Sequence, residues 1–385
     1  MRIGLDARFL THPQRGGFKT YSRNLIDSIV HLDNVNRYFI YLDRTPLDYD
    51  KLPSKDNISY RIISGNFPVI GMPLREQVLL RRYLYKDRLD VFHSLCNTAP
   101  VGITMKNIIT LHDTIQVSTN IGLQNFSDLW YWLVTVYSRW SIHATIHDSF
   151  RIITVSEYEK QKILDFFQIS DNDKVVVTHL APHAIFRPAD PGEKAGLRKM
   201  IGKKFNIHSD YLLGIGYEKR KNIPLLVEAF RQLANEFINL NLVIVVADED
   251  KRIYFQKLAS RYNLDERVIV LGSVSATDLY VLYNLAKVFV FPSERESFGL
   301  PPLEAISCGT PTIAMNSTST PEILEDGAML IDGKDADKWA EAIRTVLVDN
   351  DVRSRMTERG LKRAAELSWE KCARKTIDMY EMALE

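Results

Sequence analysis

Short apolar runs alternate with helix-like segments along most of the chain, and this alternation constrains the fold more than any other feature. The runs have the length of buried strands, and they lie at residues 38–42, 108–111, 152–155, 212–215, 242–246, 268–271, 288–291 and 312–315. Strands that alternate with helices form βαβ units, in which helices cover both faces of a parallel sheet. The sequence therefore predicts an α/β protein made of doubly wound, Rossmann-like domains.

The length of the chain, 385 residues, predicts two such domains. Prolines and glycines interrupt the pattern between residues 186 and 196, and a second series of strands begins at Tyr211. We expect an N-terminal domain over residues 1–185 and a C-terminal domain over residues 186–367, facing each other across a cleft. Ligands of doubly wound sheets bind beyond the carboxyl ends of the strands, so functional residues are expected in the loops there.

Composition and charge exclude several classes of protein. The chain has 49 Lys and Arg against 48 Asp and Glu, so it lacks the basic excess of a nucleic-acid-binding protein. Cys96, Cys308 and Cys372 have no metal-ligand spacing, which argues for a reducing compartment without disulfides or structural zinc. Arg2 and Asp6 stand where a signal peptide needs apolar residues, and no apolar run is long enough to span a membrane. We therefore expect a cytoplasmic protein.

The strongest local signal is a loop and a helix start that follow the predicted strand at 288–291. Pro301-Pro302 opens the helix, and Gly309 follows its end. The N–H groups at the start of a helix have no partner within it and, with the helix dipole, form an anion site. Gly299 allows a ligand to approach the backbone closely. We expect a phosphorylated ligand at the loop of residues 296–300.

Two glutamates, Glu296 and Glu304, flank the start of this helix. Their separation along the helix does not suit a glycosidase, in which two carboxyl groups flank one scissile bond. It suits two carboxylates that accept hydrogen bonds from different parts of one hydroxyl-rich ligand. In the alternative interpretation, Glu296 is a solvated loop residue and Glu304 only complements the helix dipole.

Arg220 and Lys221 follow the predicted strand at 212–215, so two cations lie at the carboxyl end of a strand. Paired cations neutralise a diphosphate and stabilise it as a leaving group. The alternative is a solvated basic turn, and Lys219 remains a possible substitute for one member of the pair.

Weaker candidates lie elsewhere in the chain. Gly16-Gly17 follows the first strand, and His112-Asp113 ends the strand at 108–111. By residue type alone these positions are a tight turn and a structural histidine. Ser319 and Glu322 either contact a ligand or cap the helix that starts at Pro321.

The stretch of residues 279–323 resembles the retaining glycosyltransferases of family GT4, which have the GT-B fold. The matching motifs there are Leu282-Tyr283, Val290-Phe291-Pro292-Ser293, Glu296-x7-Glu304, Gly299-Leu300-Pro301, Cys308-Gly309-Thr310-Pro311 and Ser319-Thr320-Pro321-Glu322. Further matches extend over nearly the whole chain, at Arg15-Gly16-Gly17, Asp90-Val91-Phe92-His93, Leu111-His112-Asp113, Val155-Ser156, Arg220-Lys221-Asn222 and Ser368-Trp369. The resemblance implies a GT-B fold whose last helix, residues 368–385, packs back on the N-terminal domain.

The resemblance also assigns roles to the matched positions. In the family the first glutamate of the pair contacts the donor sugar and the second contacts the ribose of the nucleotide, which implies these roles for Glu296 and Glu304. It groups His112, Arg220 and Lys221 with Glu296 as catalytic residues. The other implied contacts are to the donor, from Gly17, Ser297, Phe298, Gly299 and Leu300, and to the acceptor, from Gly16 and Asp113. Ser297 departs from the glycine that relatives more often have, which narrows the space beside the sugar.

The implied reaction is retaining transfer of a hexose from a nucleoside diphosphate sugar to a glycan or lipid-linked acceptor hydroxyl, in cell-surface polysaccharide synthesis. The resemblance implies no cofactor and no metal. The pattern is most similar to the mannosyltransferase branch, which favours GDP-mannose over UDP-sugars as donor. A nucleotide-sugar epimerase and a non-enzymatic partner subunit that binds nucleotide sugars remain as alternatives. We expect the Glu296→Ala variant to lose transfer and keep its fold.

Residues 72–90 form a candidate membrane contact on the inner face of the membrane. The segment combines a cationic excess, from Arg75, Arg81, Arg82, Lys86 and Arg88 against Glu76, Asp87 and Asp90, with apolar Leu74, Val78, Leu79 and Leu84. Such a helix binds an anionic membrane surface or is an ordinary amphipathic surface helix. The aromatic segment at 126–140 has the same ambiguity, with core packing favoured.

Overall fold

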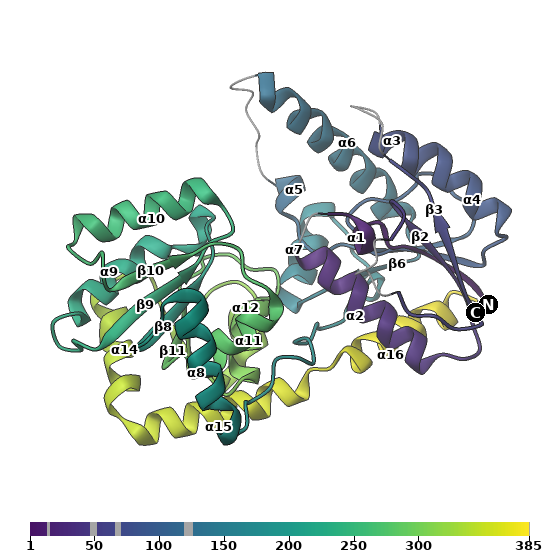
Figure 1. Ribbon diagram of the computed structural model, residues 1–385. Coiled ribbons are helices and arrows are strands. Elements are labelled where there is room, and N and C mark those ends of the chain that lie inside the picture. The colour runs from purple at the N-terminus through teal and green to yellow at the C-terminus, as the bar shows by residue number, and fades with distance from the viewer. Residues whose placement is uncertain (14–15, 47–51, 66–70, 119–125, 385) are drawn as a thin grey trace. The chain divides into compact units, whose positions relative to one another are not determined.

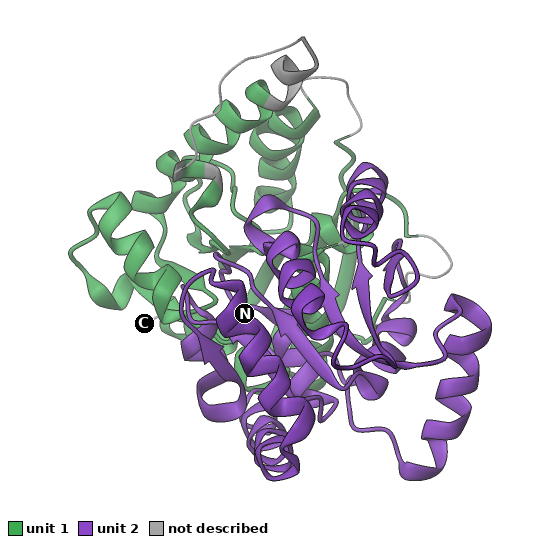
Figure 2. Cartoon of the chain, turned by 90° about the vertical axis from the view of Figure 1, so that its left-hand side faces the viewer, with its two compact units in different colours: residues 1–180, 369–385 green, residues 181–368 purple. Residues whose placement is uncertain are grey.

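The computed structural model describes residues 1–13, 16–46, 52–65, 71–118 and 126–384, and of residues 116, 118 and 126–131 only the backbone. The chain divides into two compact units (Figure 2). Unit 1 consists of Met1–Leu180 and Trp369–Glu385, and unit 2 consists of Ala181–Ser368. Each unit is built on one parallel sheet, so the prediction of two Rossmann-like α/β domains is confirmed.

Unit 1 contains a seven-stranded sheet of order β3-β2-β1-β4-β5-β6-β7 (Figure 1). Its strands are β1 Arg2–Asp6, β2 Arg37–Leu42, β3 Ile58–Ile62, β4 Val91–Ser94, β5 Lys106–Thr110, β6 Arg151–Thr154 and β7 Val175–Val177. Its helices are α1 Arg8–Thr11, α2 Gly17–Leu32, α3 Gly71–Leu74, the π-helix η1 Arg75–Leu80, α4 Arg81–Lys86, α5 Ile115–Ser118, α6 Phe126–Asp148, α7 Glu157–Phe167, the 3₁₀ turn η2 Asn172–Lys174 and α16 Trp369–Met382. The register sets β1 between β2 and β4, with Ile3 opposite both Tyr38 and Val91.

Unit 2 contains a six-stranded sheet of order β10-β9-β8-β11-β12-β13. Its strands are β8 Asp210–Ile215, β9 Leu240–Val245, β10 Val268–Leu271, β11 Val288–Phe291, β12 Thr312–Met315 and β13 Met329–Ile331. Its helices are α8 Pro191–Phe205, the 3₁₀ turn η3 Lys219–Lys221, α9 Ile223–Leu233, α10 Glu249–Arg261, α11 Ala276–Leu285, α12 Leu300–Ser307, α13 Thr320–Leu324, the 3₁₀ turn η4 Glu325–Gly327, α14 Ala336–Val348 and α15 Asn350–Glu366. The strand order reverses between β8 and β11, so the loops after these two strands are adjacent.

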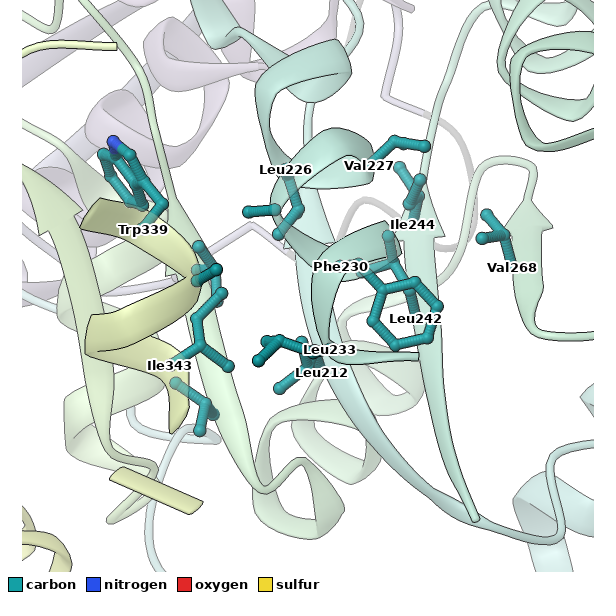
Figure 3. Packing of buried hydrophobic residues seen from close by; sticks show 14 of the residues in the cluster. Leu212, Leu226, Val227, Phe230, Leu233, Leu242, Ile244, Val268, Trp339 and Ile343 are labelled. Atoms are coloured by element: carbon teal, nitrogen blue, oxygen red, sulfur yellow. The ribbon is translucent and has the colours of Figure 1, made fainter. Parts of the chain in front are cut away.

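The core of unit 2 lies between its sheet and the helices α9 and α14 (Figure 3). Leu226, Phe230 and Leu233 recur at helical spacing on α9 and are buried, as are Trp339 and Ile343 of α14. Burial of one such side chain contributes about 1.5–3 kcal/mol. This apolar support fixes β8, whose carboxyl end leads into the candidate site.

Helix α16 belongs to unit 1 although it follows unit 2 in the chain. It packs against α2 (Figure 1), and its inward face is buried. That face consists of Trp369, Cys372, Ala373, Thr376, Met379 and Tyr380. The core of unit 1 is therefore closed by residues about 200 positions away from the rest of it.

A buried network of charges occupies unit 1 where the sequence predicted a surface helix. Arg75 bonds Asp6 at 2.9 Å, and Arg8 bonds both Asp6 at 3.0 Å and Glu76 at 2.5 Å. All four side chains are buried. Burial alone would raise the pKa of Asp6, but Arg75 and Arg8 lower it to about 2. Arg75 and Glu76 are thus internal ion-pair partners, and the interpretation of residues 72–90 as one surface helix is wrong for them.

Helix α6 turns its hydroxyl-bearing residues inward toward this network. Tyr137 and Ser141 donate hydrogen bonds to Glu76 at 2.6 and 3.1 Å. Val136 and Trp140, in contrast, are 43% and 51% exposed. The expected core packing of residues 126–140 is therefore wrong for Val136 and Trp140. The inner face of α6 carries Tyr137 and Ser141 instead, because the buried carboxylate of Glu76 needs hydroxyl partners. Among the described residues, no helix is both long and apolar enough to cross a bilayer.

Candidate active site

Charged residues from the loops after β8 and β11 meet at one carboxylate oxygen in unit 2. Nζ of Lys221 lies 2.6 Å from Oε1 of Glu296, and Nη1 of Arg220 lies 3.1 Å from the same oxygen. The hydroxyl of Ser293 donates a hydrogen bond to the same oxygen. Lys219 is exposed. The structure thus brings Arg220, Lys221 and Glu296 together, and of the candidate cations it is Arg220 and Lys221 that bind Glu296.

Lys221 is held from three directions. Its ammonium group faces the ring of Phe291 at 4.8 Å from the centroid, in addition to the bond to Glu296. Gly216 borders its aliphatic part, and a Cβ atom at Gly216 would lie 2.6 Å from Cγ of Lys221. Gly216 also has a φ of 137°, which disfavours any other residue. Lys221 is consequently only 8% exposed and has a fixed position.

Arg220 is the more accessible of the two cations. Its side chain is 34% exposed, and its Nη1 also donates to the carbonyl oxygen of Arg295 at 2.5 Å. Its Nη2 lies 3.5 Å from Glu218. The guanidinium group therefore has a face that a ligand can reach, whereas the ammonium of Lys221 is enclosed.

The loop that carries Glu296 is tied to the segment after β12. The amide of Glu296 donates to the hydroxyl of Thr318 at 3.0 Å, and the hydroxyl of Ser319 donates to the carbonyl of Glu296 at 2.9 Å. The Ser319 side chain makes no capping bond to α13, so that alternative is wrong. Ser319 instead fixes the backbone on which Glu296 is mounted.

The start of α12 has the predicted form. Gly299 is the residue before the helix and has a φ of 93°, and Pro301 and Pro302 occupy the first turn. Phe298 is buried and anchors the loop, while Ser297 and Leu300 are partly exposed. Pro301 and Pro302 carry no N–H, so among the first three residues of α12 the amide of Leu300 alone can donate, and the attraction for an anion comes mainly from the helix dipole.

Glu304 lies in the second turn of α12 and is partly buried. The hydroxyl of Tyr283, from α11, donates to its Oε2 at 3.2 Å. Burial raises the pKa of Glu304 to about 8, against the opposing effect of Tyr283. A carboxyl group that is mostly protonated at pH 7 both donates and accepts hydrogen bonds. Glu304 is therefore more than a complement to the helix dipole.

The second predicted group lies in unit 1, where His112 follows β5. The loop after β4 holds it: its amide donates to Oδ1 of Asn97 at 2.9 Å, and its Nε2 lies 3.1 Å from the carbonyl oxygen of Leu95. A carbonyl only accepts, so Nε2 carries the proton and Nδ1 is an acceptor. Burial lowers the pKa of His112 to about 4, so the imidazole is neutral at pH 7.

The first turn of α2 packs on the ring of His112. Gly16, with a φ of 145°, and Gly17 start this helix. Phe18 and Tyr21 then place their rings edge-on to His112, at centroid distances of 4.7 and 4.6 Å. The Gly-Gly turn and His112 are thus neighbours, as the sequence predicted for one site. Arg15, which precedes the turn, lies outside the described residues.

Asp113 directs its carboxylate to the backbone of the short helix α5. Its Oδ1 accepts from the amide of Ile115 at 2.9 Å.

Neither Asn97 nor Ser293 was predicted as a site residue. Ser293 lies within the matched Val290-Phe291-Pro292-Ser293 motif, whereas Asn97 carries no local signal. Among the described residues, no group of three or more His, Cys, Asp or Glu side chains could hold a metal ion.

Comparison with known proteins gives one family match. Residues 216–363 match the family described as "Glycosyl transferases group 1", which covers β9–β13 and the candidate loops of unit 2. The O-antigen chain mannosyltransferase B of Escherichia coli is 34% identical over 251 residues, which is 64% of this chain and 64% of that protein. The match thus spans less than two thirds of that relative's length.

Solved structures show the same fold. Sucrose-phosphate synthase from Thermosynechococcus elongatus superposes with a TM-score of 0.75 at 19% identity, over 100% of this chain and 99% of that one. The Anabaena protein HepE in complex with UDP-glucose superposes with a TM-score of 0.72 at 15% identity, over 99% of each chain. These likenesses concern the fold, and they confirm the predicted GT-B class.

Proposed function

We propose, since residues 216–363 match the group 1 glycosyl transferase family, that the protein is a retaining hexosyltransferase that moves mannose from GDP-mannose to a glycan or lipid-linked acceptor hydroxyl. The observation that carries the proposal is the convergence of Arg220, Lys221 and Glu296 beside the start of α12. It combines cations and the positive end of a helix dipole for a diphosphate with a carboxylate for sugar hydroxyls.

The two cations have different tasks in this proposal. Arg220, which is partly exposed, binds the diphosphate oxygens directly. Lys221, which is enclosed, holds Oε1 of Glu296, so that Oε2 accepts from a hydroxyl of the donor sugar. Glu304 binds the ribose, and Gly17 and the loop of residues 297–300 contact the donor.

Transfer with retention proceeds by attack on the same face from which the diphosphate leaves. The acceptor oxygen bonds to the anomeric carbon as the sugar–phosphate bond breaks, and the departing diphosphate oxygen takes the acceptor proton. Arg220, the amide of Leu300 and the positive end of the α12 dipole stabilise the charge that develops on the leaving group. In this proposal these groups replace a metal ion, and no cofactor takes part. Nδ1 of His112 accepts from a donor sugar hydroxyl, and Gly16 and Asp113 contribute to acceptor binding.

Two nucleotides compete as the carrier of the donor sugar, GDP and UDP. The similarity to an O-antigen chain mannosyltransferase favours GDP-mannose as the donor and O-antigen synthesis as the process. The UDP-glucose complex of HepE favours a UDP-sugar as the alternative. Nucleotide binding distinguishes the two.

We expect GDP to raise the unfolding temperature selectively. A ligand at about 100 times its dissociation constant stabilises by roughly 2.7 kcal/mol, which shifts the unfolding of a domain of this size by several degrees. Thermal unfolding with GDP, UDP, ADP and dTDP measures this. A shift with UDP alone selects the UDP-sugar alternative, and no shift with any nucleotide contradicts the transferase proposal.

A control variant ties this shift to the site. Glu304→Leu removes the ribose contact and, because the carboxyl group it replaces is mostly neutral at pH 7, leaves no charge unpaired. We expect it to lose most of the nucleotide shift. Its own unfolding temperature should fall somewhat, because the buried hydroxyl of Tyr283 loses its acceptor, so the nucleotide shift is measured from the variant's own baseline. A full nucleotide shift in this variant contradicts the ribose role of Glu304.

Peripheral contact with an anionic bilayer, on the cytoplasmic face, is also proposed. Tyr137 of α6 bonds Gln77 of η1 at 2.9 Å, so these two elements are adjacent. They and α4 expose the apolar side chains of Val78, Tyr85, Leu133, Val136 and Trp140. Arg82, Lys86 and Arg88 are exposed on α4 or just after it. Apolar groups beside cations suit insertion at an anionic lipid surface.

We expect the protein to sediment with phosphatidylcholine vesicles that contain phosphatidylglycerol, in a salt-dependent way, and not with phosphatidylcholine alone. The double variant V136S/W140S should lose most of this binding, because it removes exposed apolar area. Ile238→Ser, at a 71% exposed position in unit 2, is the matched control and should bind as before. Equal sedimentation of all three proteins contradicts the assignment of this surface.

A further inference from the structure

A chain of hydrogen bonds in unit 1 runs from the last helix to the surroundings of His112. The hydroxyl of Tyr380, on α16, lies 2.7 Å from Nδ1 of His93. Nε2 of His93 lies 2.7 Å from Oγ1 of Thr110, and the hydroxyl of Tyr21 lies 3.1 Å from the same Oγ1. Four side chains from α16, β4, β5 and α2 are thereby joined in series.

All four side chains, Tyr380, His93, Thr110 and Tyr21, are fully buried. Water therefore does not compete for their polar atoms, and loss of one hydroxyl leaves a buried partner unsatisfied. Removal of a hydroxyl at one end of the chain therefore changes the hydrogen bonding of the next member.

His93 is the link that couples the two bonds on either side of it. Burial, followed by the nearby His112, lowers the pKa of His93 to about 3, so it is neutral. A neutral imidazole donates through one nitrogen and accepts through the other. Tyr380 and Thr110 each present a hydroxyl that can donate or accept, one at each nitrogen, so His93 donates to one of them and accepts from the other.

Tyr21 carries the chain to His112. Its ring stands edge-on to the His112 ring at 4.6 Å and 87°. The ring of Trp369, at the start of α16, lies 6.2 Å from Tyr21, so α16 supports Tyr21 at a second point. The hydroxyl of Tyr21 is anchored on Thr110, and its ring in turn limits how His112 can rotate.

We propose that Tyr380, His93, Thr110 and Tyr21 are positioning residues that set the ring orientation of His112, and that α16 is thereby a working part of the site. The effect on transfer rests on the proposed function of His112. The effect on the His112 ring does not, because it follows from the contacts alone. The two are therefore tested by separate measurements.

The test compares Tyr380→Phe with Thr376→Val. The first keeps the ring and removes the hydroxyl that bonds His93. The second removes a hydroxyl from the same buried face of α16, where it bonds only the carbonyl of Cys372 at 2.8 Å. Both variants lose one buried hydrogen bond on the same face of α16, so an effect that comes only from altered packing of α16 appears in both.

We expect the ring ¹⁵N and ¹H NMR signals of His112 to move in Tyr380→Phe and to stay in place in Thr376→Val. Transfer by Tyr380→Phe should fall about three- to tenfold in kcat, with the donor KM within about twofold. Thr110→Val interrupts the chain between His93 and Tyr21 and should reproduce both effects. It replaces Tyr380→Phe in the test if that variant does not fold. Unmoved His112 signals in both chain variants overturn the proposal.

The rate of sugar transfer separates this inference from the proposed function. If the His112 signals move but His112→Ala transfers sugar at the original rate, the role of His112 in transfer is wrong and the positioning chain has no catalytic consequence. If Thr376→Val moves the signals as far as Tyr380→Phe, the effect belongs to the packing of α16 and the chain proposal is overturned.

Discussion

Glu296→Gln is expected to lower the rate of sugar transfer at least about 100-fold while the protein remains folded. Removal of one preorganised charge-stabilising contact in an active site typically costs a factor of about 100 to 1,000 in kcat. Glutamine keeps the size of Glu296 and an oxygen acceptor for Lys221 and Arg220, but it loses the charge that binds the sugar hydroxyl. Steady-state kinetics with the donor selected by nucleotide binding measures the effect.

The Glu296→Ala variant is a poorer test than the sequence suggested. Ala leaves the enclosed Lys221 with neither a counter-ion nor a hydrogen-bond acceptor, and breaking a buried ion pair from one side costs about 3–5 kcal/mol. Gln also removes the counter-ion, but it keeps an oxygen acceptor for Lys221 and therefore costs less stability. The expectation that this variant keeps its fold is therefore revised to a loss of stability as well as activity. Glu294→Gln is the matched control, since Glu294 stands two residues earlier and pairs with Lys334 at the surface. Full activity of Glu296→Gln, with Glu294→Gln also active, contradicts the assignment of Glu296.

Glu76→Ala is expected to destabilise unit 1 by about 3–5 kcal/mol, because it leaves Arg8 buried with only one carboxylate partner. It also removes the acceptor of Thr98, Tyr137 and Ser141. Chemical denaturation followed by circular dichroism measures this change.

Arg82→Gln, an exposed position six residues along the same segment, is the control for Glu76→Ala. We expect it to change the free energy of unfolding by less than about 0.5 kcal/mol. If both variants are equally mild, the charge network does not stabilise the fold and the surface-helix interpretation of Glu76 returns.

The sequence predicts strands well where they are apolar runs of four or more residues. It misses the three-residue strands β7 and β13, and it fails where buried strands carry polar residues. β11 and β12 have the predicted bounds. β4 was not predicted as a strand because His93 and Ser94 make half of it polar, yet both are buried. The Ser94 hydroxyl donates to the nearby carbonyl of Thr98. His93 bonds Thr110 and Tyr380, which are distant in the chain, and no local pattern contains that information.

The candidate site shows the same division between local and distant information. The turn at Gly299 and the helix start are local, so the sequence predicts them. The direct bond between Lys221 and Glu296 joins residues 75 positions apart, and motif spacing predicts that both belong to one site without predicting that they bind each other. Arg75 was assigned to the surface for a related reason: charge predicts exposure unless a buried partner is known.

The return of α16 to unit 1 bears on how the protein folds during its synthesis. Unit 2 is one continuous stretch of chain, so it has all its residues once Ser368 has left the ribosome. Unit 1 begins first but must wait for Tyr380, and at about 5–20 residues per second this delay after Leu180 is on the order of ten seconds or more. During that interval the face of α2 that later packs on α16 is open to solvent. The half of the protein made first is thus completed last, and it is the half that nascent-chain chaperones would need to protect.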